Sequence, residues 1–398
     1  MSSRPATGHP APRVALISVG IGRVQRGFER YFSDLFDVLQ GPVALTLFKS
    51  GGDSGAHERV PAGLRLVTAL VRRLPGRWWG RTTYHRDCLA YAICLIPALW
   101  AGRFELIHCI DPPLAAVLGR LRGLGLMRTP LLFTEGSLMP ASYYPSASHI
   151  HHVGQAAMAA AIAAGVPASH MTLVPCGVHG ERFPPLEPQA RERLRQRHGV
   201  APQCLVVLVV SARMRKHKRV DHVIEEVARL LPSTPPDELL LWIDGHPEEA
   251  EIDALAHSRL GARCRVSHVG TDEVAELYQL ADLLVHGALE ESFGLVIVEA
   301  MCSGLPVLVH DSPHFRWLVG DDGQTVDMAQ PGALADCLRV WRRLAPADRP
   351  RPDLARVRAR FDWRALAQDY AALYRHTIDG ASRTQPICAT PPSPGHTP

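Results

Sequence analysis

Two glutamates with seven residues between them, Glu291 and Glu299, flank a glycine in the stretch 290–307. The pattern predicts a loop up to Gly294 and a helix after it. Gly294 lets the backbone approach a ligand closely, and the amides that follow it open a helix whose N-terminus attracts an anion. Glu291 would lie in the loop beside that anion. Glu299 would lie roughly 7 Å further along the helix, where a carboxylate can accept hydrogen bonds from two hydroxyls, such as those of a ribose.

A cluster of cations follows a second apolar run. Cys204–Val210 is apolar at every position, which is typical of a central parallel strand. Lysines and arginines come directly after it: Arg213, Arg215, Lys216, Lys218 and Arg219. Cations at the exit of a buried strand are better explained as counter-charges for a phosphate than as a solvated helix face.

Strands and helices alternate in both halves of the chain, and this order predicts how the candidate residues are positioned. In the first half, strand Val14–Val19, a glycine loop and a helical pattern up to Leu39 form the first unit of a doubly wound sheet. In the second half, strand Asp282–His286 leads into the loop with Glu291, and strand Pro306–His310 follows. The sequence therefore predicts an α/β fold of two Rossmann-like domains, each with a doubly wound parallel sheet, facing a central cleft.

Length and composition agree with two domains. The chain has 398 residues, of which 46% are hydrophobic and 21% charged, ordinary values for globular proteins. The Pro-rich segment 183–188 is typical of a linker. We expect a disordered N-terminus at 1–12, an N-terminal domain at 13–185, a C-terminal domain at 186–380 whose last helix packs back on the first domain, and a disordered tail at 381–398.

Cysteines and termini indicate the compartment. The nine cysteines form no CxxC pair, which favours a reducing environment over a disulfide framework or a zinc site. No apolar run suits a signal peptide or a membrane span. We therefore expect a cytoplasmic protein.

Polar residues at the ends of strands in the first half are candidates for binding an acceptor. His108, Asp111 and Glu135 lie at or just after expected strands, and ligands gather beyond the carboxyl ends of parallel strands. For each, a capped loop or an internal hydrogen bond is an equal alternative. Gly22 and Gly270 also follow expected strands and are candidates for backbone contact with the donor. The loop at Gly22 has neither a complete dinucleotide fingerprint nor a P-loop lysine.

The histidines His149, His151 and His152 do not predict a metal site. Neighbouring residues on a strand point to opposite faces, and no carboxylate triad accompanies these histidines. We expect neither a metal ion nor a cofactor.

The segment 66–100 leaves two interpretations open. It holds Arg77, Trp78, Trp79 and Arg81 before a thirteen-residue apolar run. Tryptophan beside arginine is typical of an anchor on an anionic membrane surface. The alternative is a helix packed on the sheet with two surface tryptophans. Residues 1–190 are also basic, with 18 lysines and arginines against 11 acidic residues. This excess fits an anionic partner or, equally well, an ordinary solvated surface.

Several motifs occur together in an order that resembles family 4 retaining glycosyltransferases of the GT-B fold. Glu291-x7-Glu299 with the Phe293-Gly294 pair resembles the signature of that family. Arg213-x4-Lys218 matches its Arg/Lys pair, and Val174–Val178 resembles its Pro-Asn-Gly-Val segment between the domains. Further matches are Ala281-Asp282 and the helix at Trp363. The resemblance covers roughly residues 14–378.

The resemblance implies a nucleotide-sugar donor and a role for each matching residue. Arg213 and Lys218 would bind the diphosphate and stabilise it as it leaves. Glu299 would hold the ribose. Glu291, with the amides of Phe293, Gly294 and Leu295, would hold the donor sugar and phosphate. Glycosyl transfer needs such neutralisation of its leaving group, and two cations with a helix N-terminus supply it without a metal ion.

The implied function is sugar transfer to a glycan or lipid-linked acceptor, in the synthesis of a cell-surface polysaccharide or lipopolysaccharide. The reaction would take place in the cytoplasm or at the inner face of the membrane. No nucleic acid is expected as a partner.

Three positions depart from the family pattern: Arg219 replaces a glycine, Gly27-Phe28 replaces a glycine pair, and Glu135 replaces a histidine. A sugar-nucleotide epimerase, or another enzyme of this fold, and a non-catalytic sugar-binding scaffold remain alternatives. Retention of configuration rests on the resemblance alone.

Overall fold

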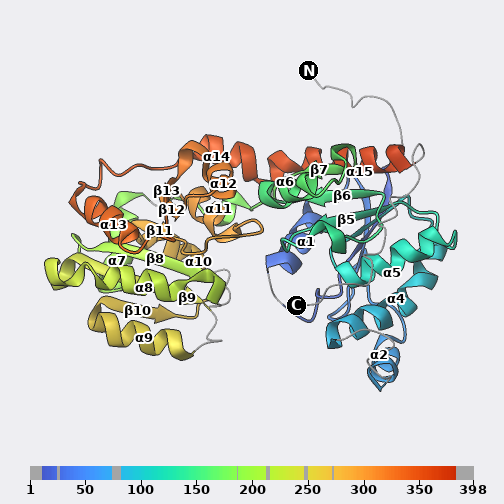
Figure 1. Cartoon of the computed structure of the whole chain (residues 1–398), viewed down its shortest axis with the longest axis horizontal. Helices are drawn as coiled ribbons and strands as arrows, with labels where there is room; N and C mark the ends of the chain where they lie inside the picture. The colour runs from blue at the N-terminus through green and yellow to red at the C-terminus, as the bar shows by residue number, and fades with distance from the viewer. Residues whose placement is uncertain are drawn as a thin grey trace. The chain divides into compact units, whose positions relative to one another are not determined.

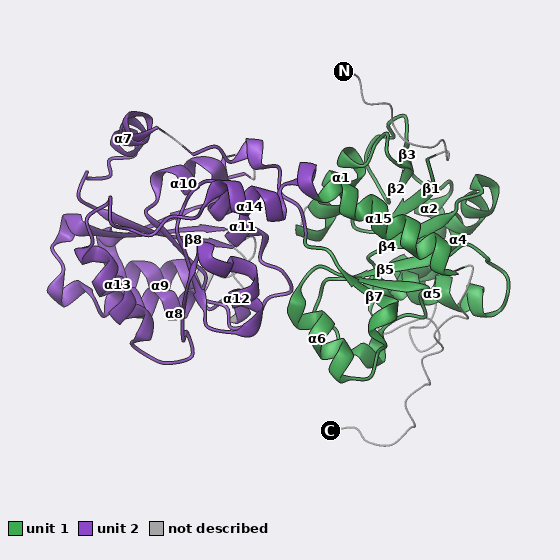
Figure 2. Cartoon of the chain, turned by 90° about the horizontal axis from the view of Figure 1, so that it is seen from above, with its two compact units in different colours: residues 1–175, 366–398 green, residues 176–365 purple. Residues whose placement is uncertain are grey.

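The computed structural model describes residues 11–24, 27–73, 82–185, 187–211, 216–245, 250–270 and 273–381. Three sequence predictions concern residues outside these ranges: the cation Arg213, the tryptophans Trp78 and Trp79, and most of the two ends expected to be disordered. The chain forms two compact units, unit 1 with residues 1–175 and 366–398 and unit 2 with residues 176–365 (Figure 2).

Unit 1 is built on a seven-stranded sheet in the order β3-β2-β1-β4-β5-β6-β7, with every neighbouring pair parallel. The order reverses at β1 and β4, as in a doubly wound sheet. Its strands are β1 (Arg13–Ile17), β2 (Ala44–Phe48), β3 (Glu58–Arg59), β4 (Leu106–Cys109), β5 (Leu131–Glu135), β6 (His149–His152) and β7 (Met171–Leu173).

Helices cover both faces of this sheet. The helices described in unit 1 are α1 (Gly27–Val38), α2 (Leu64–Arg73), α4 (Thr83–Gly102), α5 (Pro112–Gly123), α6 (Gln155–Ala163) and α15 (Trp363–Ala381). Alternate strand residues such as Ile107 and Phe133 form one core with α4 and α5. The residues between them, such as His108 and Thr134, point to the opposite face. There Phe32 of α1 and Tyr374 of α15 contact His108.

Unit 2 is built on a six-stranded sheet in the order β10-β9-β8-β11-β12-β13, again parallel throughout. Strand β8 is central and buried at all seven positions, which explains its continuous apolar sequence. The strands are β8 (Leu205–Ser211), β9 (Leu239–Gly245), β10 (Cys264–Ser267), β11 (Leu283–Val285), β12 (Val307–His310) and β13 (Gln324–Val326).

Two layers of helices enclose the sheet of unit 2. The helices are α7 (Pro188–Arg197), α8 (Val220–Ala228), α9 (Ala250–Leu260), α10 (Val274–Leu280), α11 (Leu295–Cys302), α12 (Pro313–Val319), α13 (Ala333–Arg343) and α14 (Leu354–Phe361). Apolar residues of α8, α9 and α13 share one core with β8 and β9. Figure 2 shows these three helices on one side of β8, with α7, α10 and α11 on the other. Figure 1 labels the helices and strands and colours the chain from blue at the N-terminus to red at the C-terminus.

The predicted α/β class, with two doubly wound parallel sheets, is confirmed. The first unit ends at Pro175, and the last helix belongs to it from Leu366 onward. The sequence placed this change of domain near 185 and assigned residues up to 380 to the second domain.

Candidate functional site

The loop between β11 and α11 holds Glu291 at the carboxyl edge of the unit 2 sheet. Its Oε1 atom accepts a hydrogen bond from Nε2 of His286 at 3.0 Å and an ion-paired hydrogen bond from Nζ of Lys218. The Glu291 side chain is 10% exposed. Both contacts go to one oxygen, and no residue in the described ranges donates to Oε2. This second oxygen remains available to a ligand hydroxyl.

The surroundings of Glu291 fix its charge. Burial alone would raise the pKa of this carboxyl. The hydrogen bond and charge of His286, together with Lys218, outweigh burial and lower the pKa to about 2. Glu291 is therefore ionised at neutral pH and can only accept hydrogen bonds.

Lys218 reaches Glu291 because the exits of two neighbouring strands touch. Strand β8 pairs with β11, and a short turn of 3-10 helix ending at Lys218 follows β8. A Cβ atom on Gly287 would lie 2.9 Å from the carbonyl oxygen of Arg219 and 3.2 Å from that of Lys218. Only glycine at position 287 allows this approach without a shift of the backbone.

Arg219 occupies the position where the family pattern has a glycine. Its φ is 51° and its ψ is 40°, a left-handed conformation that glycine adopts without cost. The turn after Lys218 therefore has the geometry of a glycine turn although an arginine forms it.

Helix α11 begins at Leu295, directly after its N-cap residue Gly294. Gly294 has φ 102°, and a Cβ atom there would lie 2.9 Å from Cδ1 of Ile297. Its carbonyl oxygen accepts from the amides of Ile297 and Val298. No described residue accepts from the amides of the two residues before them, Leu295 and Val296, which are partly exposed. Unused amides of this kind attract anions at helix N-termini, and the predicted anion contact here stays a prediction.

The side chain of Phe293 is buried inside unit 2, and the predicted contact of its amide with a donor phosphate stays a prediction. Its ring is 2% exposed and packs against Trp317 and Phe361, with centroids 6.5 and 6.2 Å apart. Its carbonyl oxygen accepts from Nε2 of His314 at 3.1 Å. Burial lowers the pKa of His314, and its Nδ1 has no hydrogen-bond partner among the described residues. This histidine fixes the backbone just before Gly294.

Glu299 lies in the second turn of α11 and is 6% exposed. Its Oε2 accepts from the hydroxyl of Tyr278, on α10, at 3.0 Å. Gly270, which follows β10, is exposed, and its carbonyl oxygen accepts from the amides of Glu273 and Val274 at the start of α10. The predicted contacts of Glu299 with a ribose and of Gly270 with a donor stay predictions.

Gly22 belongs to unit 1 and packs within it. It has φ 81°, and a Cβ atom there would lie 2.1 Å from the carbonyl oxygen of Gly51. The glycine thus allows two loops of unit 1 to touch, and its predicted contact with a donor stays a prediction.

His108 lies in the interior of unit 1 and offers no polar atom to a ligand. It is 0% exposed, its Nδ1 lies 2.9 Å from the hydroxyl of Tyr374, and its Nε2 lies 2.6 Å from Oγ1 of Thr134. Burial lowers its pKa well below the usual value, so the ring is neutral. Of the two interpretations left open for His108, the internal hydrogen bond is the one that the structure shows, because β4 continues past His108 and both faces of the sheet are covered.

Asp111 and Glu135 lie at the carboxyl edge, as predicted. Asp111 accepts from the amide of Val19 at 2.8 Å and from the hydroxyl of Tyr84 at 2.6 Å, and burial raises its pKa. Glu135 ends β5, and its Oε1 accepts three hydrogen bonds from Ser137 and Met139. Oε2 of Glu135 has no hydrogen-bond partner among the described residues. This oxygen is buried and lies 4.0 Å from Nδ1 of His152, so the predicted contact of Glu135 with an acceptor stays a prediction.

Two of the three histidines of β6 have hydrogen-bond partners inside unit 1, whereas His152 has none among the described residues and lies 4.0 Å from Oε2 of Glu135. His151 contacts Oγ1 of Thr134 and the carbonyl oxygen of Val174, each at 2.9 Å, and burial lowers its pKa to about 3. His149 contacts Oγ1 of Thr172 at 2.8 Å. Within the described ranges, no group of three His, Cys, Asp or Glu residues could hold a metal ion.

The sequence of unit 2 matches a family of known proteins. Residues 190–341 match the family model described as Glycosyl transferases group 1. Residues 190–341 are a glycosyl transferases group 1 domain. This domain contains Lys218, Gly270, Glu291, Glu299 and the start of α11.

Curated relatives match over part of their length. This chain is 30% identical over 201 residues to the lipopolysaccharide glucosyltransferase WaaG of Escherichia coli, and the aligned region covers 50% of each protein. It is 30% identical over 162 residues to the putative glycosyltransferase EpsD of Bacillus subtilis, covering 40% of this chain and 42% of EpsD. It is 30% identical over 221 residues to the D-inositol 3-phosphate glycosyltransferase of Corynebacterium glutamicum, covering 52% of each. The chain spans about half the length of these relatives.

Solved structures match over nearly the whole fold. Sucrose-phosphate synthase from Thermosynechococcus elongatus superposes with a TM-score of 0.70 at 19% identity, covering 92% of this chain and 99% of its own. HepE from Anabaena, in complex with UDP and glucose, superposes with a TM-score of 0.65 at 20% identity, and the match covers 92% of this chain and 99% of HepE. The structure of WaaG superposes with a TM-score of 0.60 at 19% identity, and the match covers 93% of this chain and 98% of WaaG. The fold that carries the group 1 domain is GT-B.

Sequence reasoning missed two histidines of the group 1 domain, His286 and His314. His286 was placed at the end of a strand and was given no role. Its position five residues before Glu291 was the available signal. His314 lies 21 residues from the carbonyl group that it contacts, and no local pattern indicated that contact. No helix in the described parts of the chain is long and apolar enough to cross a membrane.

Proposed function

We propose that the protein is a retaining glycosyltransferase of family 4 that transfers a sugar from a nucleotide-sugar donor to a glycan or lipid-linked acceptor. The observation that carries this proposal is the arrangement around Glu291. An ionised carboxylate with one oxygen available lies beside a lysine and precedes a helix N-terminus with unused amides. Such a site suits a sugar hydroxyl next to a phosphate.

The leaving diphosphate gains negative charge as the glycosidic bond breaks. Lys218 and the amides at the start of α11 would stabilise this charge, with Arg213 as a second cation. Glu291 would hold the donor sugar through Oε2, and Glu299 would hold the ribose. The cations and amides suffice for this task without a metal ion. The binding of UDP and glucose by the structural neighbour HepE supports a nucleotide-sugar donor for this chain.

The acceptor and the biological setting are inferred from similar proteins rather than from the site around Glu291. The similarity to the lipopolysaccharide glucosyltransferase WaaG and to EpsD supports a role in the synthesis of a cell-surface polysaccharide or lipopolysaccharide in the cytoplasm. In unit 1, Asp111 and Glu135 are the candidates for the acceptor side, because they lie at the carboxyl edge of the sheet, although both side chains are buried.

Peripheral contact with the inner face of a membrane is part of the proposal. On α2, Leu66 and Leu70 are 67% and 53% exposed and one turn apart, with Arg65 and Arg73 exposed beside them. Apolar and basic residues on one helix face suit an anionic lipid surface. Co-sedimentation with phosphatidylglycerol vesicles should fall for L66S/L70S and for W78A/W79A. It should stay unchanged for V340S, which replaces an exposed valine on α13 of unit 2. Equal binding by all variants would contradict membrane contact.

The test of the proposed activity is a donor screen. Purified protein is incubated with UDP-, GDP-, ADP- and dTDP-sugars, with and without cell-envelope lipid extract, and the released nucleoside diphosphate is measured. We expect one donor to be turned over with acceptor, in the presence of EDTA, and the product to keep the anomeric configuration of the donor by NMR. An epimer formed without acceptor, or donor binding without turnover across all acceptors, would contradict the proposal.

A further inference from the structure

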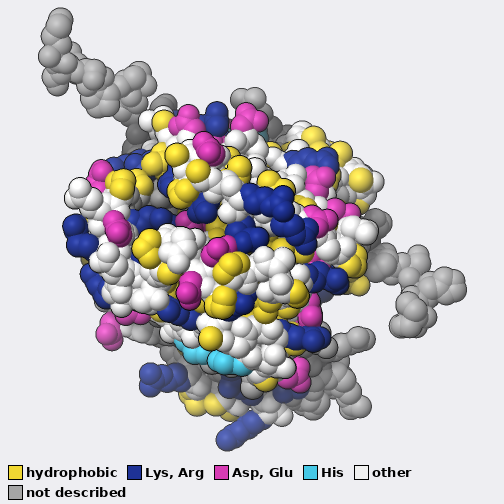
Figure 3. All heavy atoms as spheres, turned by 90° about the vertical axis from the view of Figure 1, so that its left-hand side faces the viewer, with side chains coloured by type: hydrophobic (Ala, Val, Ile, Leu, Met, Phe, Trp, Pro, Cys, Tyr) yellow, Lys and Arg dark blue, Asp and Glu magenta, His cyan; other side chains and the backbone are white. Residues whose placement is uncertain are grey.

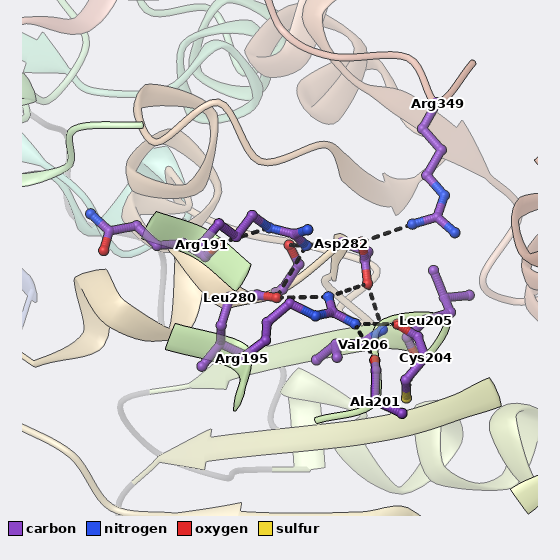
Figure 4. A network of polar contacts seen from close by, with 11 residues as sticks. Arg191, Arg195, Ala201, Cys204, Leu205, Val206, Leu280, Asp282 and Arg349 are labelled. Atoms are coloured by element: carbon purple, nitrogen blue, oxygen red, sulfur yellow. Dashed lines mark hydrogen bonds and ion pairs between the residues drawn. The ribbon is translucent and has the colours of Figure 1, made fainter. Parts of the chain in front are cut away.

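Asp282 gathers three arginines at the amino end of β11, on the edge of the unit 2 sheet opposite to Glu291. Its Oδ1 accepts from Arg191 at 2.9 Å and from Arg349 at 2.8 Å. Its Oδ2 accepts from Arg195 at 3.0 Å and from the amide of Val206 at 2.8 Å. Figure 4 shows Arg191 and Arg195 reaching Asp282 from one side and Arg349 from another. The carboxylate is thus saturated with hydrogen bonds.

Two of these arginines have a clear structural role. Arg191 and Arg195 come from α7, and they also donate to carbonyl oxygens at the end of α10 and before β8. They fasten α7 to the sheet, and a buried carboxylate partner makes such contacts strong. This role accounts for the Nη groups of Arg191 and Arg195 without any ligand, although Nε of Arg195 is buried without an acceptor among the described residues.

The third arginine is not explained in this way. The Arg349 side chain is 9% exposed, and only its Nη1 donates to Asp282. Its Nε is buried and has no acceptor among the residues that the structure describes. Nε of Arg195 is in the same state, so this atom alone does not indicate a ligand. Nη2 of Arg349 donates to no residue in the described ranges and is not among the buried atoms, so it is the nitrogen left for a ligand.

A fourth arginine lies at the same place. Arg351 is exposed and lines a pocket of about 40 Å³ together with Arg191, Arg349 and Asp282. No described residue forms an ion pair with Arg351. Asp282 is the one acidic residue in the lining, and its oxygens are already occupied. The pocket therefore has an excess of positive charge, although basic and acidic side chains are mixed on the face of unit 2 seen in Figure 3.

From these contacts we infer that the pocket binds a small oxyanion, a phosphoryl group, between Arg349 and Arg351. The planar guanidinium fork presents paired N–H donors that match phosphate oxygens. The size of the pocket suits one tetrahedral anion or the tip of a larger phosphorylated molecule. The site is separate from the proposed donor site, because Asp282 precedes β11 and Glu291 follows it. The inference does not depend on the proposed sugar transfer.

The test measures binding of inorganic phosphate by titration calorimetry at constant ionic strength. All variants carry K218A, so that phosphate at the donor site does not contribute. We expect saturable binding that R349Q and R351Q each weaken about tenfold, the loss of one charge-assisted contact. R193Q is the matched control, since Arg193 is an exposed arginine of α7 outside the pocket, and it should bind as the K218A protein does.

Two outcomes would overturn the inference: no saturable binding to the K218A protein, or equal affinity in R351Q and R193Q. R351Q decides the matter if R349Q fails to fold, because Arg351 is exposed. A second arm separates the sources of the phosphoryl group. Phosphatidylcholine vesicles with and without phosphatidic acid are tested for competition with phosphate. Competition that depends on phosphatidic acid would indicate a lipid headgroup, and its absence would indicate a soluble phosphate.

Discussion

Lys218 donates to Oε1 of Glu291 across 73 residues of sequence, and His286 shares the same oxygen at 3.0 Å. The pair joins the exits of two neighbouring parallel strands, β8 and β11. Before a donor binds, the carboxylate thus neutralises the lysine and holds it at the carboxyl edge of the sheet. A diphosphate would offer Lys218 a second anionic partner at this position.

Replacing either member of this pair should reduce donor turnover. K218A removes a cation from the developing diphosphate charge, and E291Q weakens the hold on the donor sugar. We expect kcat/KM to fall about 100-fold or more in each. E290Q is the matched control, because Glu290 is the exposed neighbour of Glu291, and its turnover should equal that of the wild type. Turnover within a few-fold of wild type in both K218A and E291Q would remove this site from the mechanism.

The depressed pKa of Glu291 predicts how stability depends on pH. A carboxyl with a pKa of about 2 in the folded state and 4.5 in the unfolded state stabilises the fold above pH 4.5, and this contribution is lost as the pH falls towards 2. Its size is roughly 3 kcal/mol at most, since each pKa unit is worth about 1.4 kcal/mol. Urea unfolding at pH 7 and pH 3.5 should therefore show a smaller loss of stability for E291Q than for E290Q. Equal losses would mean that Glu291 has an ordinary pKa.

Local sequence patterns predicted the long elements and the residues that lie near each other in sequence. The apolar run of β8 and the glycine before α11 each determine their own conformation, so their positions were predictable. Strand β11 was also predicted, as Asp282–His286, but the three-residue strand β13 and the helices α12 and α14 were not. Their residues depend on neighbours far away in the chain, as Gln324 of β13 does when it accepts from Trp341.

The side-chain partners of the site were harder to predict for a related reason. The role of His286 depends on where the loop returns to place Glu291. His108 could not be assigned to the core from β4 alone, because its partners Thr134 and Tyr374 lie 26 and 266 residues away. Asp282 was noted only as part of a motif, and its arginines come from α7 and from residue 349. Such contacts follow from topology rather than from spacing.

The turn after Lys218 predicts a difference between two replacements of Arg219. Left-handed backbone costs roughly 1–2 kcal/mol for a residue with a Cβ atom and little for glycine. R219G should therefore be about 1 kcal/mol more stable than R219A, measured by urea unfolding. The pair of variants removes the same guanidinium group, so the comparison reports on the backbone alone. Greater stability of R219A would show that residue 219 is not held in the left-handed conformation.

The approach of Gly287 to the turn at Lys218 provides a test of the site that leaves every polar side chain in place. In G287A, a Cβ atom would meet the carbonyl oxygen of Arg219 at 2.9 Å and Cγ2 of Val223 at the same distance. The β8 exit must then move away, and Lys218 with it. We expect a loss of about 1–3 kcal/mol in unfolding free energy, the usual cost of overpacking, and a fall in turnover about as large as that of K218A. G123A is the control, since a Cβ atom on Gly123 meets nothing within 4 Å. If G287A kept full turnover, contact between the two strand exits would not be what positions Lys218.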